Sequence, residues 1–322
     1  MLPRVRRHVR KVALVAAVLV ALACGARTGL DSPEELDGSF PDVQQDVAHD
    51  VEAEADAAEE DVIPPIDATF PDVPIPNDCP DAGSTLVYVI GAANDLYSFY
   101  PPTLTFTKIG TVACMTTSTP FSMAVNRLGI AYSVFTPDDA LFQVSTANAA
   151  CQTTPYAPNQ MGFDMFGMGY ASNPDGGESL YVIQVDFNNP SMGLGTIDTT
   201  AFTFSFIGTF SSSLTPECEL TGTGDGRLYA LCLPKTGKGS TLAQIDPATA
   251  NIVGEDSLTT GGSEEALAFA FWGGDFWIFT SPGGTSPTTT VTEYDPVAKT
   301  ETAMTTLSAE IVGAGVSTCA PQ

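Results

Sequence analysis

The sequence predicts an all-β fold: a five-bladed β-propeller with terminal strand closure, preceded by a signal peptide and a disordered acidic linker. From residue 79 onward, short β-branched and aromatic segments alternate with turns rich in Gly, Pro, Asn and Asp. The pattern recurs at roughly 45 residues, the range of propeller blades. An irregular β-sandwich is the alternative architecture. A sixth blade would need more chain than the sequence comfortably supplies.

Residues 1–23 have the pattern of a lipoprotein signal peptide. Basic side chains crowd positions 4–11, and residues 12–23 are apolar but too few to cross a hydrocarbon core about 30 Å thick. The run closes with Val20-Ala21-Leu22-Ala23-Cys24, a small residue followed by the cysteine that receives the lipid. We therefore expect cleavage before Cys24 and lipidation of its thiol. The alternative is an ordinary signal peptide followed by a chance cysteine.

Residues 24–78 are predicted to be a disordered, acidic, Pro-containing tether. The segment is rich in Asp, Glu, Ala and Pro and has few aromatic residues. Such a composition buries too little apolar surface to offset the entropy lost on ordering, and its charges repel one another. As a coil it would span about 40 Å, enough to hold the folded domain, residues 79–322, away from a lipid surface.

Four copies of the blade pattern are complete. Each has a small-residue inner strand, an aromatic second strand and a third strand that often ends in Asp-Pro. The four inner strands start near residues 122, 164, 219 and 265. Residues 85–111 supply only the outer three strands of a blade, whereas residues 310–316 supply only an inner strand. Pairing these two ends completes a fifth blade and leaves no exposed edge.

Six cysteines follow Cys24, an even set that predicts disulfides in an exported chain. Cys218 and Cys232 flank the Asp225-Gly226 hairpin almost symmetrically, so they should face each other. Cys319 follows the closing strand and should return to Cys79. Cys114 and Cys151 remain as the third pair. Spacing alone leaves fifteen connectivities open, so this pairing is a geometric hypothesis.

Several segments resemble a known group of proteins. Cys24-Gly25-Ala26-Arg27-Thr28-Gly29-Leu30, followed by an acidic tail, resembles the start of lipoproteins from myxobacterial-type genomes. Segments 219–225, 268–275 and 311–319 are similar to signatures of one such family with a propeller-like domain. The resemblance implies envelope location and architecture but no activity. The blades are also similar to NHL, YVTN and PQQ-type propellers, without their cofactor-docking motifs, so no cofactor is implied. Gly25 after the lipidated cysteine resembles the sorting signal for the outer membrane.

Polar residues recur at the start of each predicted inner strand. They are Ser122, Asp164, Glu219, Glu265 and Glu310. Because inner strands line the channel of a propeller, we expect these side chains to ring one of its mouths. Clustered carboxylates would raise a pKa and could hold Ca²⁺ or another hard cation. Three interpretations are open. The residues could form a binding site for a cation, a cationic peptide or sugar hydroxyls, or they could belong to a carbohydrate-active enzyme or lectin. They could also be a polar rim that merely faces water.

Composition excludes several classes of function. Basic residues beyond position 80 are few and scattered, which excludes a nucleic-acid footprint. The only histidines, His8 and His49, precede the predicted domain, so His-dependent nucleophiles and zinc sites are excluded from it. We therefore predict a non-catalytic propeller that is exported, lipid-anchored to the outer membrane and displayed for binding of an unidentified protein or glycan.

Overall fold

The computed structural model describes residues 63–66, 79 and 86–322, except residues 188, 213, 215, 216, 264 and 283–286. The predicted signal peptide, Cys24 and most of the predicted tether lie outside the described residues. Lipidation of Cys24 therefore stays a prediction, as does disorder of the tether outside residues 63–66.

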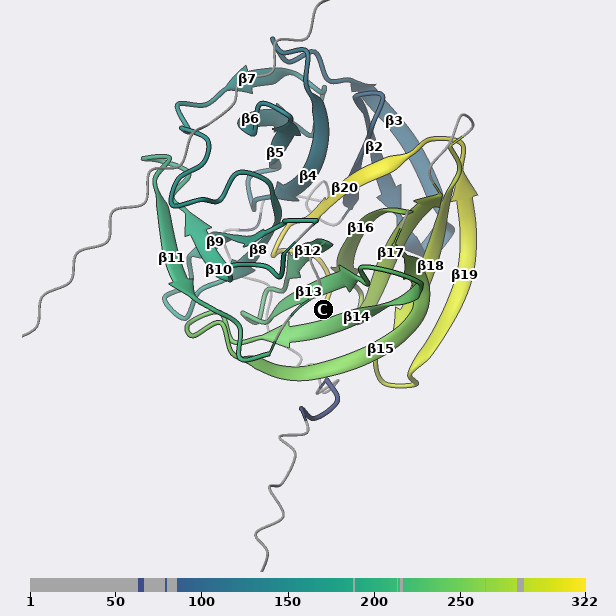
Figure 1. Ribbon diagram of the computed structural model, residues 1–322. Helices are drawn as coiled ribbons and strands as arrows, with labels where there is room; N and C mark the ends of the chain where they lie inside the picture. The colour runs from purple at the N-terminus through teal and green to yellow at the C-terminus, as the bar shows by residue number, and fades with distance from the viewer. Residues whose placement is uncertain are drawn as a thin grey trace, which may run out of the picture. The chain divides into compact units, whose positions relative to one another are not determined.

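Five four-stranded antiparallel sheets surround a common axis, each in meander order from the axis outward (Figure 1). Blade 1 contains β4 (Thr119–Val125), β5 (Ile130–Thr136), β6 (Ala140–Ser145) and β7 (Cys151–Thr153). Blade 2 contains β8 (Phe166–Ser172), β9 (Glu178–Gln184), β10 (Leu194–Ile197) and β11 (Phe204–Gly208). Blade 3 contains β12 (Glu217–Gly222), β13 (Leu228–Leu233), β14 (Lys238–Ile245) and β15 (Ile252–Gly262).

Blade 4 contains β16 (Glu265–Trp272), β17 (Asp275–Pro282), β18 (Thr289–Asp295) and β19 (Thr300–Leu307). Blade 5 combines both ends of the described chain: β20 (Ile311–Val316) pairs with β1 (Val87–Gly91), followed by β2 (Asp95–Tyr100), the 3₁₀ helix η2 (Pro101–Thr103) and β3 (Thr105–Thr111). Val87 lies opposite Val316, and Gly91 lies opposite Ile311. The five-bladed propeller and its closure by terminal strands are confirmed.

The hydrophobic core is divided into layers between neighbouring blades. One cluster joins blades 1 and 2 through Tyr132, Phe166 and Tyr170, and comparable clusters fill the other spaces between blades. The aromatic residues predicted on the second strands, including Tyr229 and Trp277, are buried in these layers. Burial of such large side chains between blades is the main favourable contribution to folding.

The inner strands approach one another closely because of their glycines. A Cβ atom at Gly167 of β8 would lie 2.2 Å from the carbonyl oxygen of Cys218 in β12. A Cβ atom at Gly313 of β20 would lie 2.9 Å from the backbone nitrogen of Met123 in β4. Only a residue without a side chain permits this approach, so the axial channel is narrow.

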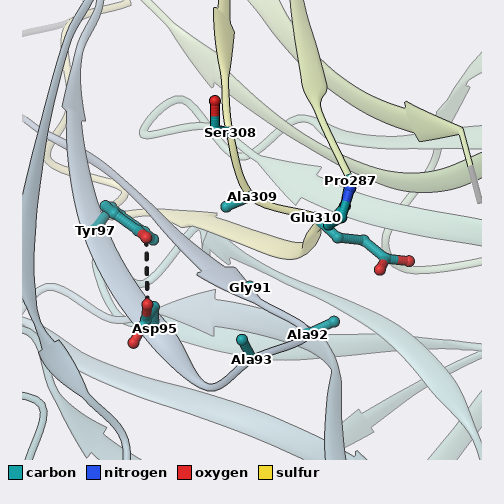
Figure 2. A pocket seen from close by; sticks show the side chains of 9 residues that line it. All are labelled: Gly91, Ala92, Ala93, Asp95, Tyr97, Pro287, Ser308, Ala309 and Glu310. Atoms are coloured by element: carbon teal, nitrogen blue, oxygen red, sulfur yellow. Dashed lines mark hydrogen bonds between the residues drawn. The ribbon is translucent and has the colours of Figure 1, made fainter. Parts of the chain in front are cut away.

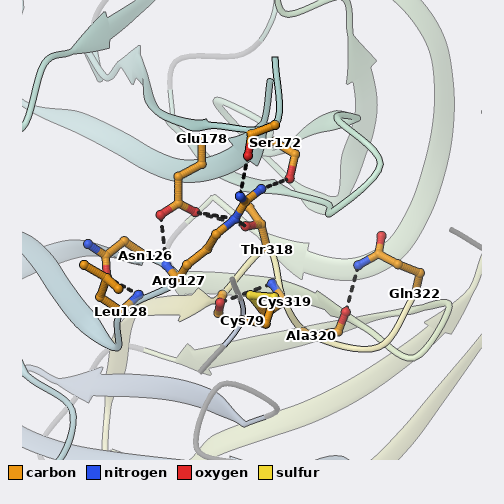
Figure 3. Close-up of a disulfide and its surroundings, with 12 residues drawn as sticks. Cys79, Asn126, Arg127, Leu128, Ser172, Glu178, Thr318, Cys319, Ala320 and Gln322 are labelled. Carbon is orange, nitrogen blue, oxygen red and sulfur yellow. Dashed lines mark hydrogen bonds and ion pairs between the residues drawn. A yellow bond between two sulfur atoms is a disulfide. The ribbon is translucent and has the colours of Figure 1, made fainter. Parts of the chain in front are cut away.

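The three disulfides pair as expected: Cys79–Cys319, Cys114–Cys151 and Cys218–Cys232. The Cys218–Cys232 bridge joins directly opposed residues of β12 and β13. The Cys79–Cys319 bridge spans 240 residues and attaches the chain before β1 to the segment after β20 (Figure 3). It therefore fastens the ring at the blade that contains both ends.

Residues 317–322 close one mouth of the channel. Arg127 Nε donates a hydrogen bond to Thr318 Oγ1 at 2.8 Å, and Thr318 Oγ1 donates one to Glu178 Oε2 at 2.9 Å (Figure 3). The N–H of Gly224 donates to Gln322 Oε1 at 3.2 Å, and the N–H of Gly273 donates to the carbonyl of Pro321 at 2.8 Å.

These contacts reach four blades. Each contacted residue lies in or beside the turn between the first and second strands of its blade. Those four turns mark the same end of the ring, the end at which the inner strands finish. The C-terminal segment therefore covers that mouth, and among the residues that the structure describes none covers the opposite mouth in this way.

A short part of the predicted tether lies against the propeller. Ile63 packs on the cluster between blades 2 and 3, and Ile66, 3% exposed, lies in the cluster between blades 3 and 4. The carbonyl of Pro64 accepts a 2.8 Å hydrogen bond from the N–H of Glu255 in β15. Gly254 leaves room for this approach, since a Cβ there would lie 3.0 Å from Ile66 Cα. Residues 63–66 thus lie against the outermost strand of blade 3.

Loss of the Cys79–Cys319 bridge should destabilise the fold more than loss of Cys218–Cys232. The first closes a loop of 240 residues and the second a loop of 14. On the loop-entropy estimate the costs are about 5 and about 3 kcal/mol. Thermal unfolding of the Cys79→Ala/Cys319→Ala and Cys218→Ala/Cys232→Ala double variants under non-reducing conditions measures the difference. Equal melting temperatures would contradict a role of the long bridge in ring closure.

Candidate binding site at the open mouth of the channel

A small cavity occupies the axis at the mouth that the C-terminal segment leaves open. Its volume is about 150 Å³, and four inner strands contribute to its wall. The lining residues are Pro120, Phe121, Glu217, Glu219, Ala266, Leu267 and Val312. All of them lie in the first half of their strands, away from the turns covered by residues 317–322. The cavity is therefore a blind recess in the channel.

The polar part of the recess comes from β12. Glu217 and Glu219 are two residues apart on this strand, so their side chains point to the same side. Ser122 Oγ of β4 donates a 2.5 Å hydrogen bond to Glu219 Oε2 and accepts one of 3.1 Å from the N–H of Met168 in β8. One hydrogen-bonded chain thus links blades 1, 2 and 3 across the axis.

Burial shifts the protonation of both carboxyl groups. Glu219 is 5% exposed, and desolvation raises its pKa well above the ordinary value. Ser122 and the N–H of Met168 oppose this rise, whereas the charge of Glu217 adds to it. Desolvation also raises the pKa of Glu217 to about 7. The empty recess therefore favours protonated carboxyls, and Glu217 gains its charge only as the pH rises through about 7.

The structure brings together two of the five residues predicted for the channel mouth, Ser122 and Glu219. Asp164 accepts a hydrogen bond from the N–H of Met165 and lines a separate hollow of about 340 Å³. Glu265 is the first residue of β16, and Glu310 precedes β20 and lines a third hollow. A binding role for any of the five stays a prediction.

The register of the inner strands explains this separation. The hydrogen bond to Ser122 places Met168 level with it, and Asp164 comes four residues earlier. The N–H of Phe271 donates to Thr221 Oγ1, which places Glu265 about four residues nearer the entrance than Glu219. At roughly 3.3 Å per residue, four residues correspond to about 13 Å along a strand. The predicted ring is thus spread over different depths.

Glu217 was missed by the sequence analysis. The inner strand of blade 3 was predicted to start at residue 219, whereas β12 starts at Glu217. The two-residue spacing of the glutamates was a signal that both could face the axis. The signal was not used because the predicted strand began two residues too late, at Glu219.

A third hollow, of about 390 Å³, lies beside blade 5 at the same end of the ring (Figure 2). Asp95 and Tyr97 stand on one side of it and Glu310 on the other (Figure 2). Asp95 accepts hydrogen bonds from Lys108 Nζ and Thr111 Oγ1, both at 2.6 Å, and one from the Tyr97 hydroxyl at 3.4 Å. Lys108 is the largest of the influences that lower the pKa of Asp95. Asp95 is thus a paired carboxylate, and Glu310 is a second acidic residue that lines the hollow.

The described residues bear on metal binding and on membrane spans. They contain no group of three or more His, Cys, Asp or Glu placed to hold a metal ion. They also contain no helix long and apolar enough to cross a membrane. Binding of Ca²⁺ stays a prediction without a ligand set among these residues.

The chain is a five-bladed β-propeller. No protein-family model matches it, and no curated protein matches it in sequence. Solved structures similar to it include a chain of the nidogen/laminin complex, with 11% identity and a TM-score of 0.45 over 71% of this chain and 97% of that one. Hydrazine synthase of Kuenenia stuttgartiensis has 14% identity and a TM-score of 0.39 over 67% of this chain and 64% of that one. TolB of Acinetobacter baumannii has 14% identity and a TM-score of 0.41, over 70% and 53%.

The stability of the protein should fall as pH rises from 4.5 to 7, in part through Glu217. Its pKa is raised from 4.5 to about 7 on folding, so in this window the unfolded chain has lost a proton that the folded chain keeps. The contribution is up to about 3 kcal/mol. Glu217→Gln should flatten the dependence of the unfolding free energy on pH, measured by urea denaturation at pH 5 and pH 8.

Glu265→Gln is the matched control, because it removes one carboxyl from the same end of the neighbouring inner strand. It corrects for the general relief of charge repulsion in a chain of net charge −26. If Glu217→Gln and Glu265→Gln flatten the pH profile equally, burial of Glu217 is not its cause.

Proposed function

We propose that this protein is an exported lipoprotein of the cell envelope and that its propeller is a non-catalytic binding module. One observation carries the binding proposal. The channel is covered at one mouth by the chain's own C-terminal segment and ends at the other in a recess with one buried carboxyl, Glu219, and one half-buried carboxyl, Glu217. A recess that is blind, partly apolar and partly polar has the composition of a ligand site.

Export is supported by the three disulfides, since such bonds persist in oxidising compartments. Lipid anchoring is supported by the residues before Cys24 and by Cys24 itself. Placement in the outer membrane is supported by Gly25, on resemblance to lipoprotein sorting signals. The acidic segment after Cys24 would then act as a spacer between the lipid and the propeller.

The geometry of the recess favours binding over glycoside hydrolysis. A glycosidase places its two carboxyls on opposite sides of the scissile bond. Glu217 and Glu219 instead lie on one strand, on the same wall. The volume of about 150 Å³ is also below the roughly 300 Å³ at which small-molecule sites begin. A sugar chain would not reach both carboxyls in this arrangement.

A second candidate, glycan binding, is favoured by the hollow beside blade 5. Its volume of about 390 Å³ is large enough for a sugar unit. Tyr97 offers an aromatic ring, and Glu310 offers a carboxylate that can accept hydrogen bonds from hydroxyls (Figure 2). This lectin-like alternative uses a different part of the same face.

Lipidation is tested by expressing the full-length chain in a bacterial host with radiolabelled palmitate. The wild-type protein should carry label and sediment with membranes, because the thiol of Cys24 is the acceptor. Cys24→Ala should lose both properties. Cys79→Ala/Cys319→Ala controls for the general effect of losing cysteines. Membrane association of an unlabelled Cys24→Ala protein would contradict the proposed anchor.

Binding is tested by thermal unfolding of the purified lipidated protein in detergent with a panel of Ca²⁺, other divalent cations, basic peptides, oligosaccharides and cell-wall fragments. A stabilising ligand should raise the melting temperature by an amount that follows its concentration relative to Kd. A shift abolished by Glu219→Gln assigns the ligand to the recess. A shift abolished by Glu310→Gln and Tyr97→Ala assigns it to the hollow beside blade 5. No shift with any member of the panel would contradict binding of these ligand classes.

A further inference from the structure

The recess on the axis has two chemically different parts. Its apolar part, called the neck below, is lined by Phe121 of β4, Leu267 of β16 and Val312 of β20 and lies at about the same depth as Glu217. Its polar wall carries Glu217 and Glu219. A ligand that matches both parts has an aliphatic stem and a positively charged end.

We propose that the recess binds the side chain of a lysine on a partner polypeptide, with its methylenes in the neck and its ammonium at the two glutamates. The proposal rests on the proposed binding function and names the chemistry recognised at that site. The partner is a polypeptide that presents an exposed lysine to the open face of the propeller.

The size of the recess agrees with this ligand. A volume of about 150 Å³ equals roughly five water molecules at about 30 Å³ each. It accommodates a linear chain of four methylenes and one ammonium group. The lining apolar residues would cover the methylenes, which contribute about 0.8 kcal/mol each when buried.

The hydrogen bonding of Glu219 favours lysine over arginine. A guanidinium group is held best by both oxygens of one carboxylate. Oε2 of Glu219 already accepts the 2.5 Å hydrogen bond from Ser122, so this carboxyl cannot offer both oxygens freely. An ammonium group is a compact charge that can use one oxygen from each of Glu217 and Glu219.

The protonation of the recess prepares it for a cation. Burial without a positive partner raises the pKa of both glutamates, and an ammonium group beside them would lower it again. Lysine binding would therefore release protons, and its affinity should increase with pH from 5.5 to 8. This coupling distinguishes the recess from a site whose carboxylates are ionised beforehand.

The groups that face the recess from neighbouring elements are neutral or acidic. Ser122 on β4 and the N–H of Met168 on β8 face Glu219 directly. The titratable groups at the entrance ends of the other inner strands are Asp164 before β8, Glu265 on β16 and Glu310 before β20. None of the described residues that line the cavity is basic. The ends of the inner strands around the recess are therefore acidic, while Lys235 and Lys238 lie in or beside the turn between β13 and β14 at the same end of blade 3.

The test uses the purified mature lipoprotein in detergent and the blocked pentapeptide Gly-Gly-Lys-Gly-Gly, with binding measured by calorimetry at low salt and pH 8. Three comparison peptides carry Nε-acetyl-lysine, arginine or norleucine at the central position. We expect the lysine peptide to bind at least tenfold more tightly than each of them. Affinity should fall at least fivefold at pH 5.5. Equal binding of the acetylated peptide would overturn the proposal.

Matched variants locate the site. Glu217→Gln and Glu219→Gln should each weaken binding of the lysine peptide at least tenfold, whereas Glu265→Gln and Glu310→Gln should change it less than twofold. Ala266→Leu fills the neck without changing charge and should also weaken binding. Circular dichroism and the melting temperature establish that each variant is folded. An equal loss in Glu265→Gln would indicate diffuse attraction to an acidic face and overturn the proposal.

The result separates this inference from the proposed function. If a member of the ligand panel stabilises the protein through Glu310 or Tyr97 while the lysine peptide does not bind, the lysine site is wrong and the binding function stands. If neither the panel nor the peptide binds, both fail.

Discussion

The close approach of the inner strands is the constraint on which the rest of the structure depends. Gly167 and Gly169 of β8 contact the backbone of β12, and Gly313 and Gly315 of β20 contact that of β4. With β-carbons at these positions the strands would move apart and the channel would widen. In a wider channel Ser122 of blade 1 could not reach Glu219 of blade 3 across the intervening β8. The burial of Glu219, and with it the raised pKa, follows from backbone packing at the axis.

The two ends of the chain then make the channel asymmetric. Pairing of β20 with β1 completes the fifth blade, and the chain continues past β20 into the mouth at which the inner strands finish. There Thr318 accepts a hydrogen bond from Arg127 of blade 1, and Gln322 accepts one from Gly224 of blade 3. Cys319 forms a disulfide with Cys79 (Figure 3). The same segment that fastens the ring therefore covers one entrance. Among the described residues, the mouth left uncovered is the one on the face that carries Glu217, Glu265 and Glu310.

The features that could be predicted from the sequence are those set by local pattern. The repeated pattern of strands and turn residues predicted the number of blades. The incomplete blade patterns at the two ends of the domain predicted that the terminal strands pair and close the ring. The symmetric placement of Cys218 and Cys232 about a two-residue turn gave their pairing. The candidate site was harder because it depends on the offset between blades. That offset is set by the backbone contacts of Gly167 and Gly313 and by the turns that lead into each inner strand, which no pattern within a single blade reveals.

The same limit applies to Ile63 and Ile66. Their neighbours are acidic and proline-rich, so composition predicts a coil. Their burial depends on Gly254 of β15, which lies far away in sequence and leaves space for the backbone of Ile66.

Retention of carboxyl groups at the axis is itself an argument for function. An ionisable side chain that is buried without a positive partner costs stability, and an apolar replacement of similar volume is often neutral or stabilising. The residues around Glu217 and Glu219 include the apolar Phe121, Leu267 and Val312, so leucine or methionine at the glutamate positions would match the apolar wall of the recess.

Proteins commonly tolerate such a loss of stability where a functional site needs side chains that the fold itself does not need. Glu219 accepts a hydrogen bond from Ser122, whereas desolvation is the single cause of the raised pKa of Glu217. The fold therefore accounts for the carboxyl of Glu219 better than for that of Glu217. Glu217 is therefore the residue whose presence the propeller alone explains least, which is why the proposed ligand is placed beside it.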